Sequence, residues 1–336
     1  MKVTLQSLML SLVIALVTLF MGASIVQAAP VGGTIYPVQS TIPEETFQTM
    51  LVVEALSVLG YEVKPIKRVE YDDAYALVAN NDATFLAVNW SPLQKDKYLK
   101  AGGDKKFYRK GHYVVGAAQG YMIDKKTADQ YSITNLSQFK NADIASLFDS
   151  NGDGKADLTG CNLGWGCNAV IEHQLGAYQI SDKVMQNSGD YGDLIEQTIK
   201  RFRNGLPILY YAWVPYWVSG ELIPGKDVTW LKVPFSSLPG GRRSVDTALP
   251  NGDNYGFEMN SMRIVANKRF AEQNPVAAKL FEVMKLPVSD VSKQNMKMRL
   301  GENSDGDIKK HVRQWIKSHQ SVFDGWLSRA KAAVNK

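Results

Sequence analysis

The sequence of 336 residues lacks the motifs by which most enzymes are recognised. It has only four histidines, and none stands in an H-E-x-x-H pair or in another spacing typical of metal ligands. Neither a G-x-S-x-G nucleophile turn nor a G-x-x-x-x-G-K-[ST] phosphate-binding loop occurs. These absences favour a protein that does no chemistry. They leave one catalytic alternative open, an exported hydrolase whose two carboxylates are brought together only by folding.

Dense clusters of one charge sign are also missing. The 38 Lys and Arg residues are nearly balanced by 33 Asp and Glu residues, for a formal net charge of +5. No stripe of basic residues interleaved with aromatic residues runs along the chain, although nucleic-acid-binding surfaces depend on such stripes. The composition therefore excludes nucleic acid as the expected partner.

Long apolar runs are missing too, apart from one near the N-terminus. Lys2 is the only charged residue before Glu44, and an apolar stretch covers residues 8–23. The small-x-small pattern ending at Ala28 fits cleavage after that residue, and no cysteine that could carry a lipid lies nearby. No other run approaches the roughly 20 apolar residues that a spanning helix needs. We therefore predict a signal peptide over residues 1–28 and a mature protein in the periplasm.

Cysteine is scarce, and its two copies stand only six positions apart, at Cys161 and Cys167. In an exported protein such a pair predicts a disulfide bond. Closing so short a loop contributes only about 2 kcal/mol to stability in the chain-entropy model. The bond is therefore better explained as holding Trp165 and the neighbouring backbone amides in place, with a simple loop staple as the alternative.

The residues that remain after Ala28 are too many for one simple core and alternate short apolar runs with helical stretches. This pattern predicts an α/β fold with two lobes. Two strand-like runs, over residues 113–123 and 261–266, each end in a polar segment that begins a helix. We interpret them as the crossings between a discontinuous first lobe (residues 29–117 plus 262–336) and an inserted second lobe (residues 118–261).

Local patterns near the N-terminus place the first elements. Thr41 and Glu44 have the spacing of a capping box, and Gly60 is expected to end the helix that the box opens. A strand over residues 83–88 delivers Trp90 at its C-terminal end. Ligands in open α/β sheets lie beyond such strand ends, so this position favours a role for Trp90 in binding.

Trp90, Trp165 and Trp213 each lie in a short aromatic or Gly-rich patch. A quaternary ammonium offers no N–H donor, and proteins usually bind it against the faces of aromatic rings. Glycine-rich backbone, such as that around Gly166, can bring N–H groups close to an anion. A cage of the three rings beside those amides would suit a zwitterion, whereas the alternative is that each Trp only packs in a core.

An acidic segment matches part of a calcium loop. Its ligand positions would be Asp149, Asn151, Asp153 and Asp157, but the twelfth position is Gly160 and not the usual bidentate glutamate. The alternative is a turn in which these side chains bond their own backbone. No other metal site and no cofactor is expected.

Beyond these patterns, the chain resembles the periplasmic glycine betaine/proline betaine-binding proteins of osmoprotectant ABC importers. The match extends over nearly the whole mature chain and includes residues 38–41, 81–90, 101–109, 116–131, 147–167, 210–219 and 249–281. The resemblance implies a two-lobed periplasmic-binding-protein fold of the type II-like class. It also implies a monomer that closes on its ligand and passes it to an inner-membrane ABC permease.

The resemblance also implies roles for particular residues. Trp90, Trp165 and Trp213 would form the cage, and the backbone N–H groups of Gly166 and Cys167 would hold the carboxylate. The family has a histidine where this chain has Gln94, which can donate a neutral hydrogen bond but cannot carry charge. Choline and carnitine are the alternative ligands within the same class.

Overall fold

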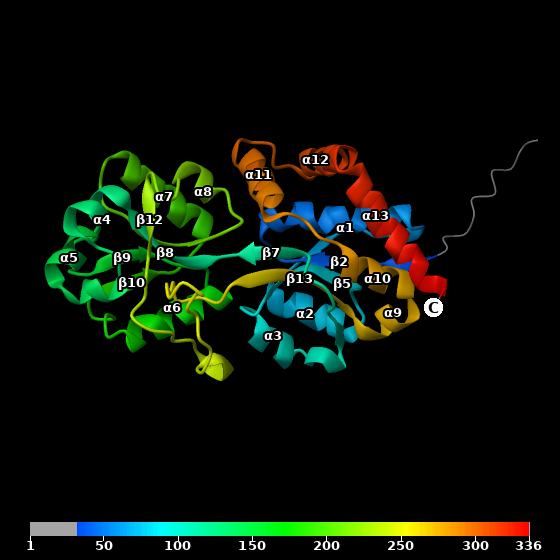
Figure 1. Cartoon of the computed structure of the whole chain (residues 1–336), viewed down its shortest axis with the longest axis horizontal. Helices are drawn as coiled ribbons and strands as arrows, with labels where there is room; N and C mark the ends of the chain where they lie inside the picture. The colour runs from blue at the N-terminus through cyan, green and yellow to red at the C-terminus, as the bar shows by residue number, and fades with distance from the viewer. Residues whose placement is uncertain (1–31, 336) are drawn as a thin grey trace, which may run out of the picture.

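The computed structural model describes residues 32–335, which form two lobes, each built around its own β-sheet (Figure 1). The predicted signal peptide lies outside the described residues. Within the described part of the chain, no helix is long and apolar enough to cross a membrane. The two-lobed α/β architecture expected from the sequence is confirmed.

The lobe that holds both ends of the described chain is built on a six-stranded sheet of order β4-β2-β5-β13-β6, with β7 also paired to β13. β2 runs parallel to β4 and β5, whereas β13 is antiparallel to its neighbours. β1 and β3 form a separate parallel pair. The strands of this lobe are β1 (Gly32–Ile35), β2 (Pro37–Gln39), β3 (Tyr61–Val63), β4 (Lys67–Arg68), β5 (Phe85–Ser91), β6 (Phe107–Tyr108), β7 (Val114–Ala117) and β13 (Asn260–Asn267).

Helices cover this sheet, with α12 packed on α1 and α13 packed on α10 (Figure 1). The α-helices of the lobe are α1 (Thr46–Val58), α2 (Tyr71–Asn80), α3 (Lys95–Lys100), α9 (Lys268–Gln273), α10 (Pro275–Val283), α11 (Val288–Arg299), α12 (Asp305–Ser318) and α13 (Gln320–Lys331). Short 3₁₀ turns are η1 (Pro43–Glu45), η2 (Gly103–Lys105) and η5 (Ala332–Asn335).

The other lobe has a five-stranded sheet of order β10-β9-β11-β8-β12. β9 is parallel to both of its neighbours, and β8 is antiparallel to β11 and β12. Its strands are β8 (Gln119–Asp124), β9 (Ala156–Thr159), β10 (Val184–Asn187), β11 (Leu209–Trp213) and β12 (Val228–Leu231). Its helices are α4 (Lys125–Tyr131), η3 (Leu136–Lys140), α5 (Ala142–Leu147), α6 (Gly166–Ala177), α7 (Tyr191–Arg203), α8 (Val218–Glu221) and η4 (Gly240–Arg242).

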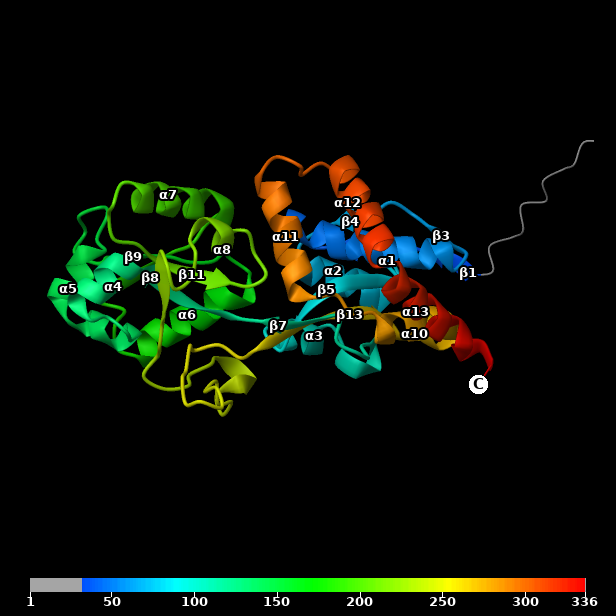
Figure 2. The same ribbon diagram turned by 45° about the horizontal axis from the view of Figure 1, so that its top comes forward.

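The apolar run over residues 113–123 is two strands and not one, because the chain changes sheets within it. Ala117 pairs with Asn260 in the first sheet, and Gln119 pairs with Trp213 in the second. Between them, the carbonyl oxygen of Ala118 accepts a hydrogen bond from the N–H of Val214 (2.8 Å). Figure 2 shows this passage from β7 to β8, and the return from β12 to β13 through an irregular segment.

The expectations for the first elements are partly confirmed. Gly60 follows α1 with φ of 91° and ends it as expected. The Thr41 capping box is wrong, because the turn there starts at Pro43 and Thr41 donates its hydroxyl to Glu70 (2.9 Å). The neighbouring hydroxyl, that of Ser40, accepts from the N–H of Ile42 instead (3.2 Å).

Candidate binding site

One pocket between the lobes, with about 550 Å³ of empty space, contains all six residues that the sequence analysis associated with a ligand. The first lobe contributes Trp90, near the end of β5, and Gln94 just before α3. The second lobe contributes Trp165 and Gly166, where α6 begins, together with Cys167 and Trp213. Because they come from both lobes, these residues surround one space only when the lobes are together.

Aromatic rings form much of the pocket wall. The rings of Trp165 and Trp213 meet edge to face, with centroids 5.8 Å apart and an interplanar angle of 80°. Trp213 also stacks on Tyr216, at 4.2 Å and 27°, and Trp90 is only 8 % exposed. Tyr211 and Tyr216 line the same pocket and were not among the residues predicted from the sequence. Tyr211 could have been found, since it lies two residues before Trp213 and therefore faces the same side of β11.

Backbone N–H groups at the start of α6 form a second wall. The residue that precedes the helix, Trp165, makes no side-chain capping hydrogen bond. The N–H groups of Gly166 and Cys167 lie in the first turn and have no acceptor within the helix. Together with the helix dipole they favour an anion at this end of the pocket.

The opposite lobe approaches this turn closely at Gly166. A Cβ atom at that position would lie 3.0 Å from Cγ of Leu93. A larger residue at position 166 would therefore require Leu93, on the opposite lobe, to shift. Glycine favours this close approach by its small size, since its φ is not in the left-handed region.

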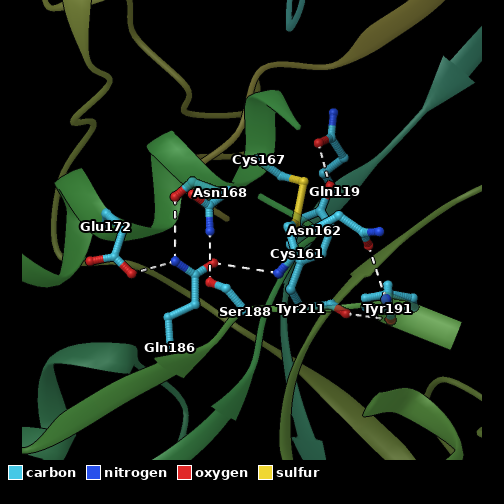
Figure 3. The surroundings of a disulfide bond; sticks show 10 residues. All are labelled: Gln119, Cys161, Asn162, Cys167, Asn168, Glu172, Gln186, Ser188, Tyr191 and Tyr211. Carbon is cyan, nitrogen blue, oxygen red and sulfur yellow. Dashed lines mark hydrogen bonds between the residues drawn. A yellow bond between two sulfur atoms is a disulfide. The ribbon is translucent and has the colours of Figure 1, made fainter. Parts of the chain in front are cut away.

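The predicted disulfide between Cys161 and Cys167 is confirmed, and it joins the loop after β9 to the first turn of α6 (Figure 3). Side-chain hydrogen bonds hold the same segment. Oδ1 of Asn162 accepts from the N–H of Tyr191 (2.9 Å), and Nδ2 of Asn168 donates to Oγ of Ser188 (2.8 Å). The fold of this loop therefore does not depend on the disulfide alone.

We expect the double substitution Cys161→Ser/Cys167→Ser to leave the protein folded, since about 2 kcal/mol of stability is at stake. Glycine betaine affinity should fall more visibly, by about fivefold or more (about 1 kcal/mol), because Trp165 and the α6 amides lose a constraint. Thermal unfolding and calorimetric titration of both proteins measure the two effects. Unchanged affinity in the folded variant would show that the bond is a simple staple.

The side chain of Gln94 is held at the pocket by hydrogen bonds to its amide oxygen. The side chain is 4 % exposed, and Oε1 accepts hydrogen bonds from the hydroxyl of Tyr75 (2.7 Å) and from Nδ2 of Asn89 (3.4 Å). With the oxygen engaged, the amide nitrogen is the group that can donate to a ligand.

Glu45 is a pocket residue for which the sequence carried no signal. The side chain is 3 % exposed, and its carboxylate accepts hydrogen bonds from Oγ of Ser40 (2.6 Å), from the hydroxyl of Tyr71 and from Nε1 of Trp90 (3.3 Å). Burial raises the pKa of Glu45 to about 7, the three hydrogen bonds oppose that rise, and the charge of Glu44 adds slightly to it. A group that titrates near neutral pH therefore lies directly beside one of the three tryptophans.

We expect glycine betaine affinity to rise with pH between about 5.5 and 8. When Glu45 is ionised, its negative charge lies beside the indole N–H of Trp90. This charge strengthens the attraction of the Trp90 ring for a cation. A bound cation in turn lowers the pKa of Glu45, so that binding releases protons. A shift of about half to one unit corresponds to a three- to tenfold change in affinity.

In the ligand-free protein, the raised pKa of Glu45 makes the free energy of unfolding fall as pH rises, whereas ligand affinity is expected to increase. The contribution of Glu45 to stability is fully present below the ordinary pKa of a glutamate and is lost as pH rises through about 7. Titrations and unfolding curves of the natural protein and of Glu45→Gln at four pH values test both expectations. An equal pH slope of affinity in the two proteins would assign the effect to another group.

The calcium candidates lie outside this pocket and bond their own loop. The carboxylate of Asp149 accepts from the N–H groups of Asn151, Gly152 and Gly154, and these bonds hold its pKa below the usual value. Asp157 accepts from the N–H and hydroxyl of Ser150 (2.7 and 2.6 Å). Over residues 32–335 no group of three or more His, Cys, Asp or Glu side chains is placed to hold a metal ion.

Comparison with known proteins relates this chain to a family. Residues 33–318 match the family model described as the substrate-binding domain of ABC-type glycine betaine transport systems. The chain is 60 % identical, over 302 residues, to the glycine betaine/proline betaine-binding periplasmic protein of Escherichia coli, covering 90 % of this chain and 91 % of that protein. It is 59 % identical over 303 residues to a glycine betaine-binding periplasmic protein of Dickeya dadantii, with the same coverage.

Solved structures agree on the fold. A lactococcal substrate-binding protein in its closed form with glycine betaine superposes with a TM-score of 0.67 at 18 % identity, covering 88 % of this chain and 99 % of that one. An ABC-transporter choline-binding protein in complex with choline gives the same TM-score and identity, covering 90 % of this chain and 96 % of that one. The chain belongs to the family of substrate-binding proteins of ABC-type glycine betaine transport systems.

Proposed function

We propose that the protein captures glycine betaine or proline betaine in the periplasm and delivers it to an inner-membrane ABC permease, without catalysis. One observation carries the proposal: a single pocket joins an aromatic wall to the uncapped start of a helix. A betaine has a quaternary ammonium at one end and a carboxylate at the other. The rings of Trp90, Trp165 and Trp213 would hold the first, and the amides of Gly166 and Cys167 the second.

The energies of these contacts suit such a ligand. A desolvated cation–π contact contributes about 2 kcal/mol or more, and it does not require an N–H donor on the cation. A carboxylate at the start of α6 gains hydrogen bonds to otherwise unpaired amides as well as the field of the helix. The relatives from Escherichia coli and Dickeya dadantii are named for binding glycine betaine, which supports the same ligand here.

We further propose that the lobes comprise residues 29–117 plus 262–336 and residues 118–261, and that they close over the ligand as a monomer. Sheet membership of the strands supports this division. Contacts across the cleft support closure: the guanidinium of Arg299 bonds Glu196 (Nη2 to Oε2, 3.1 Å), lies 3.5 Å from Glu221 and covers the ring of Trp217 at 4.3 Å. Cleavage of the signal peptide after Ala28 would release the mature chain into the periplasm.

A choline- or carnitine-binding protein of the same class is the second candidate. The choline-binding structure shares the fold at a TM-score of 0.67, so the fold alone does not separate the two. The start of α6 favours a betaine over choline, because choline has no carboxylate to accept from the two amides and to interact with the helix dipole. Carnitine does carry a carboxylate, and only the titration below distinguishes it from the betaines.

Calorimetric titration of the mature protein with glycine betaine, proline betaine, choline, carnitine and proline tests the proposal. We expect saturable binding of the two betaines at one site per chain. Proline should bind poorly, because its ammonium carries N–H groups and is strongly hydrated. Turnover of any of these compounds, followed by proton NMR, would instead favour the exported hydrolase.

A further inference from the structure

One buried donor in the pocket has no acceptor. Gln119 is the first residue of β8, is 4 % exposed and lines the pocket. Its amide nitrogen, Nε2, is buried and finds no hydrogen-bond partner anywhere in residues 32–335. Leaving such a group unpaired is costly, so a ligand that brings an acceptor to it would be favoured.

The orientation of this amide is set by a tyrosine. The hydroxyl of Tyr211, on the neighbouring strand β11, donates to Oε1 of Gln119 at 2.5 Å, as Figure 3 shows. Tyr211 is itself only 2 % exposed, so its hydroxyl is held in place by the core. With the oxygen engaged by this donor, the nitrogen of the amide is left as the donating group.

Gln119 lines the same pocket as Gly166 and Cys167 at the start of α6, and its strand runs beside that helix. Side chains two residues apart on a strand face the same side of the sheet, so Gln119 shares a face with Tyr121. The hydroxyl of Tyr121 donates to Oε1 of Gln174, which lies about two turns into α6 (2.5 Å). Gln119 lies two residues before Tyr121 on β8, at the end of the strand nearer the first lobe. Figure 3 draws it among the surroundings of Cys167.

We propose that the amide nitrogen of Gln119 is a further donor to the ligand carboxylate and thereby a determinant of specificity for carboxylate-bearing ligands; this inference rests on the proposed function. A carboxylate accepts about four hydrogen bonds. The second lobe would supply three of them, from Gly166, Cys167 and Gln119, and the amide of Gln94 on the first lobe would supply another on closure.

Two unpaired acceptors in the same pocket fit this orientation of the ligand. Oε1 of Gln48 on α1 and Oδ1 of Asn295 on α11 are buried pocket atoms for which no donor is found in the described part of the chain. Both come from the lobe opposite α6. Acceptor oxygens cannot face a carboxylate, but they suit the polarised methyl groups of a quaternary ammonium. The pocket thus offers unpaired acceptors as well as the unpaired donor of Gln119.

The test compares two ligands in matched variants. Gln119→Met removes the donor and keeps an unbranched side chain of similar length. We expect it to weaken glycine betaine at least about tenfold while changing choline affinity less than about twofold. Tyr211→Phe, which frees the orientation of the amide, should weaken glycine betaine about threefold and again spare choline. Gln197→Met, an exposed change on α7, is the matched control and should alter neither ligand.

The outcomes separate this inference from the proposed function. If the natural protein binds glycine betaine and both variants keep its ratio of glycine betaine to choline affinity, the role of Gln119 is disproved and the function stands. If both ligands weaken equally in the two variants, Gln119 only supports the fold of the pocket, and the inference is again wrong. If the natural protein binds no betaine, the proposed function itself fails. Thermal unfolding shows that each variant is folded, and Tyr211→Phe serves as the test should Gln119→Met not fold.

Discussion

Alanine in place of Trp90, Trp165 or Trp213 is expected to weaken glycine betaine binding at least about 30-fold in each case. A desolvated cation–π contact contributes about 2 kcal/mol or more, and 1.4 kcal/mol corresponds to a factor of ten in affinity. The loss at Trp213 should be the largest of the three. Its ring packs against both Trp165 and Tyr216. Removing it would therefore also take away a packing contact from two other rings of the pocket.

The control for these substitutions is Trp230→Ala. Trp230 is half-buried on β12 in the same lobe as Trp165 and Trp213, but it does not line the pocket. Calorimetric titration at one pH should show nearly natural affinity for this control. Small and equal losses at all four positions would refute the cage, since they would reflect only the general cost of removing a large side chain.

Much of the fold was predictable because it follows from local pattern. Gly60 ends α1 through a backbone conformation that glycine adopts readily. The break at Ala118 was not predictable in the same way. Residues 113–123 are largely apolar and strand-like, and only the pairing of each half with a different sheet, to Asn260 on one side and Trp213 on the other, divides the run.

The site was predictable where the chemistry of a residue type is distinctive. Three tryptophans in short aromatic or Gly-rich patches and the glycine-rich backbone around Gly166 predict a cation end and an anion end without knowledge of the fold, although the start of α6 at Gly166 came only from the structure. Glu45 and Gln119 carry no such signal. Glutamate two residues after a proline is typical of an exposed first turn, yet Glu45 is turned inward by Ser40, Tyr71 and Trp90.

The surroundings of Gln119 could not be predicted from the sequence either. Its position at the start of a strand indicates which face it occupies relative to Tyr121, but not what covers that face. Helix α6, which also lines the pocket, begins 47 residues later at Gly166. Tyr211 engages the amide oxygen of Gln119, and the amide nitrogen has no partner within residues 32–335. Sites assembled from several strands in this way depend on tertiary contacts that no local pattern contains.

Choline is expected to bind at least about tenfold more weakly than glycine betaine, and this difference measures the anion end of the pocket separately from the cage. Choline keeps the trimethylammonium group, so its contacts with Trp90, Trp165 and Trp213 would be retained. It lacks the carboxylate, and a closed pocket would leave the amides of Gly166 and Cys167 without acceptors, at a cost of about 1–3 kcal/mol. The hydroxyl of choline is a neutral acceptor, and it carries no charge to interact with the dipole of α6.

Competition calorimetry at pH 8, above the pKa of about 7 of Glu45, compares the two affinities where the charge of Glu45 differs least between the complexes. Trp213→Ala should weaken both ligands by a similar factor, because the cation end is common to them. Glycine betaine and choline of equal affinity in the natural protein would overturn the assignment of the α6 amides, since ligand recognition would then depend on the aromatic rings alone.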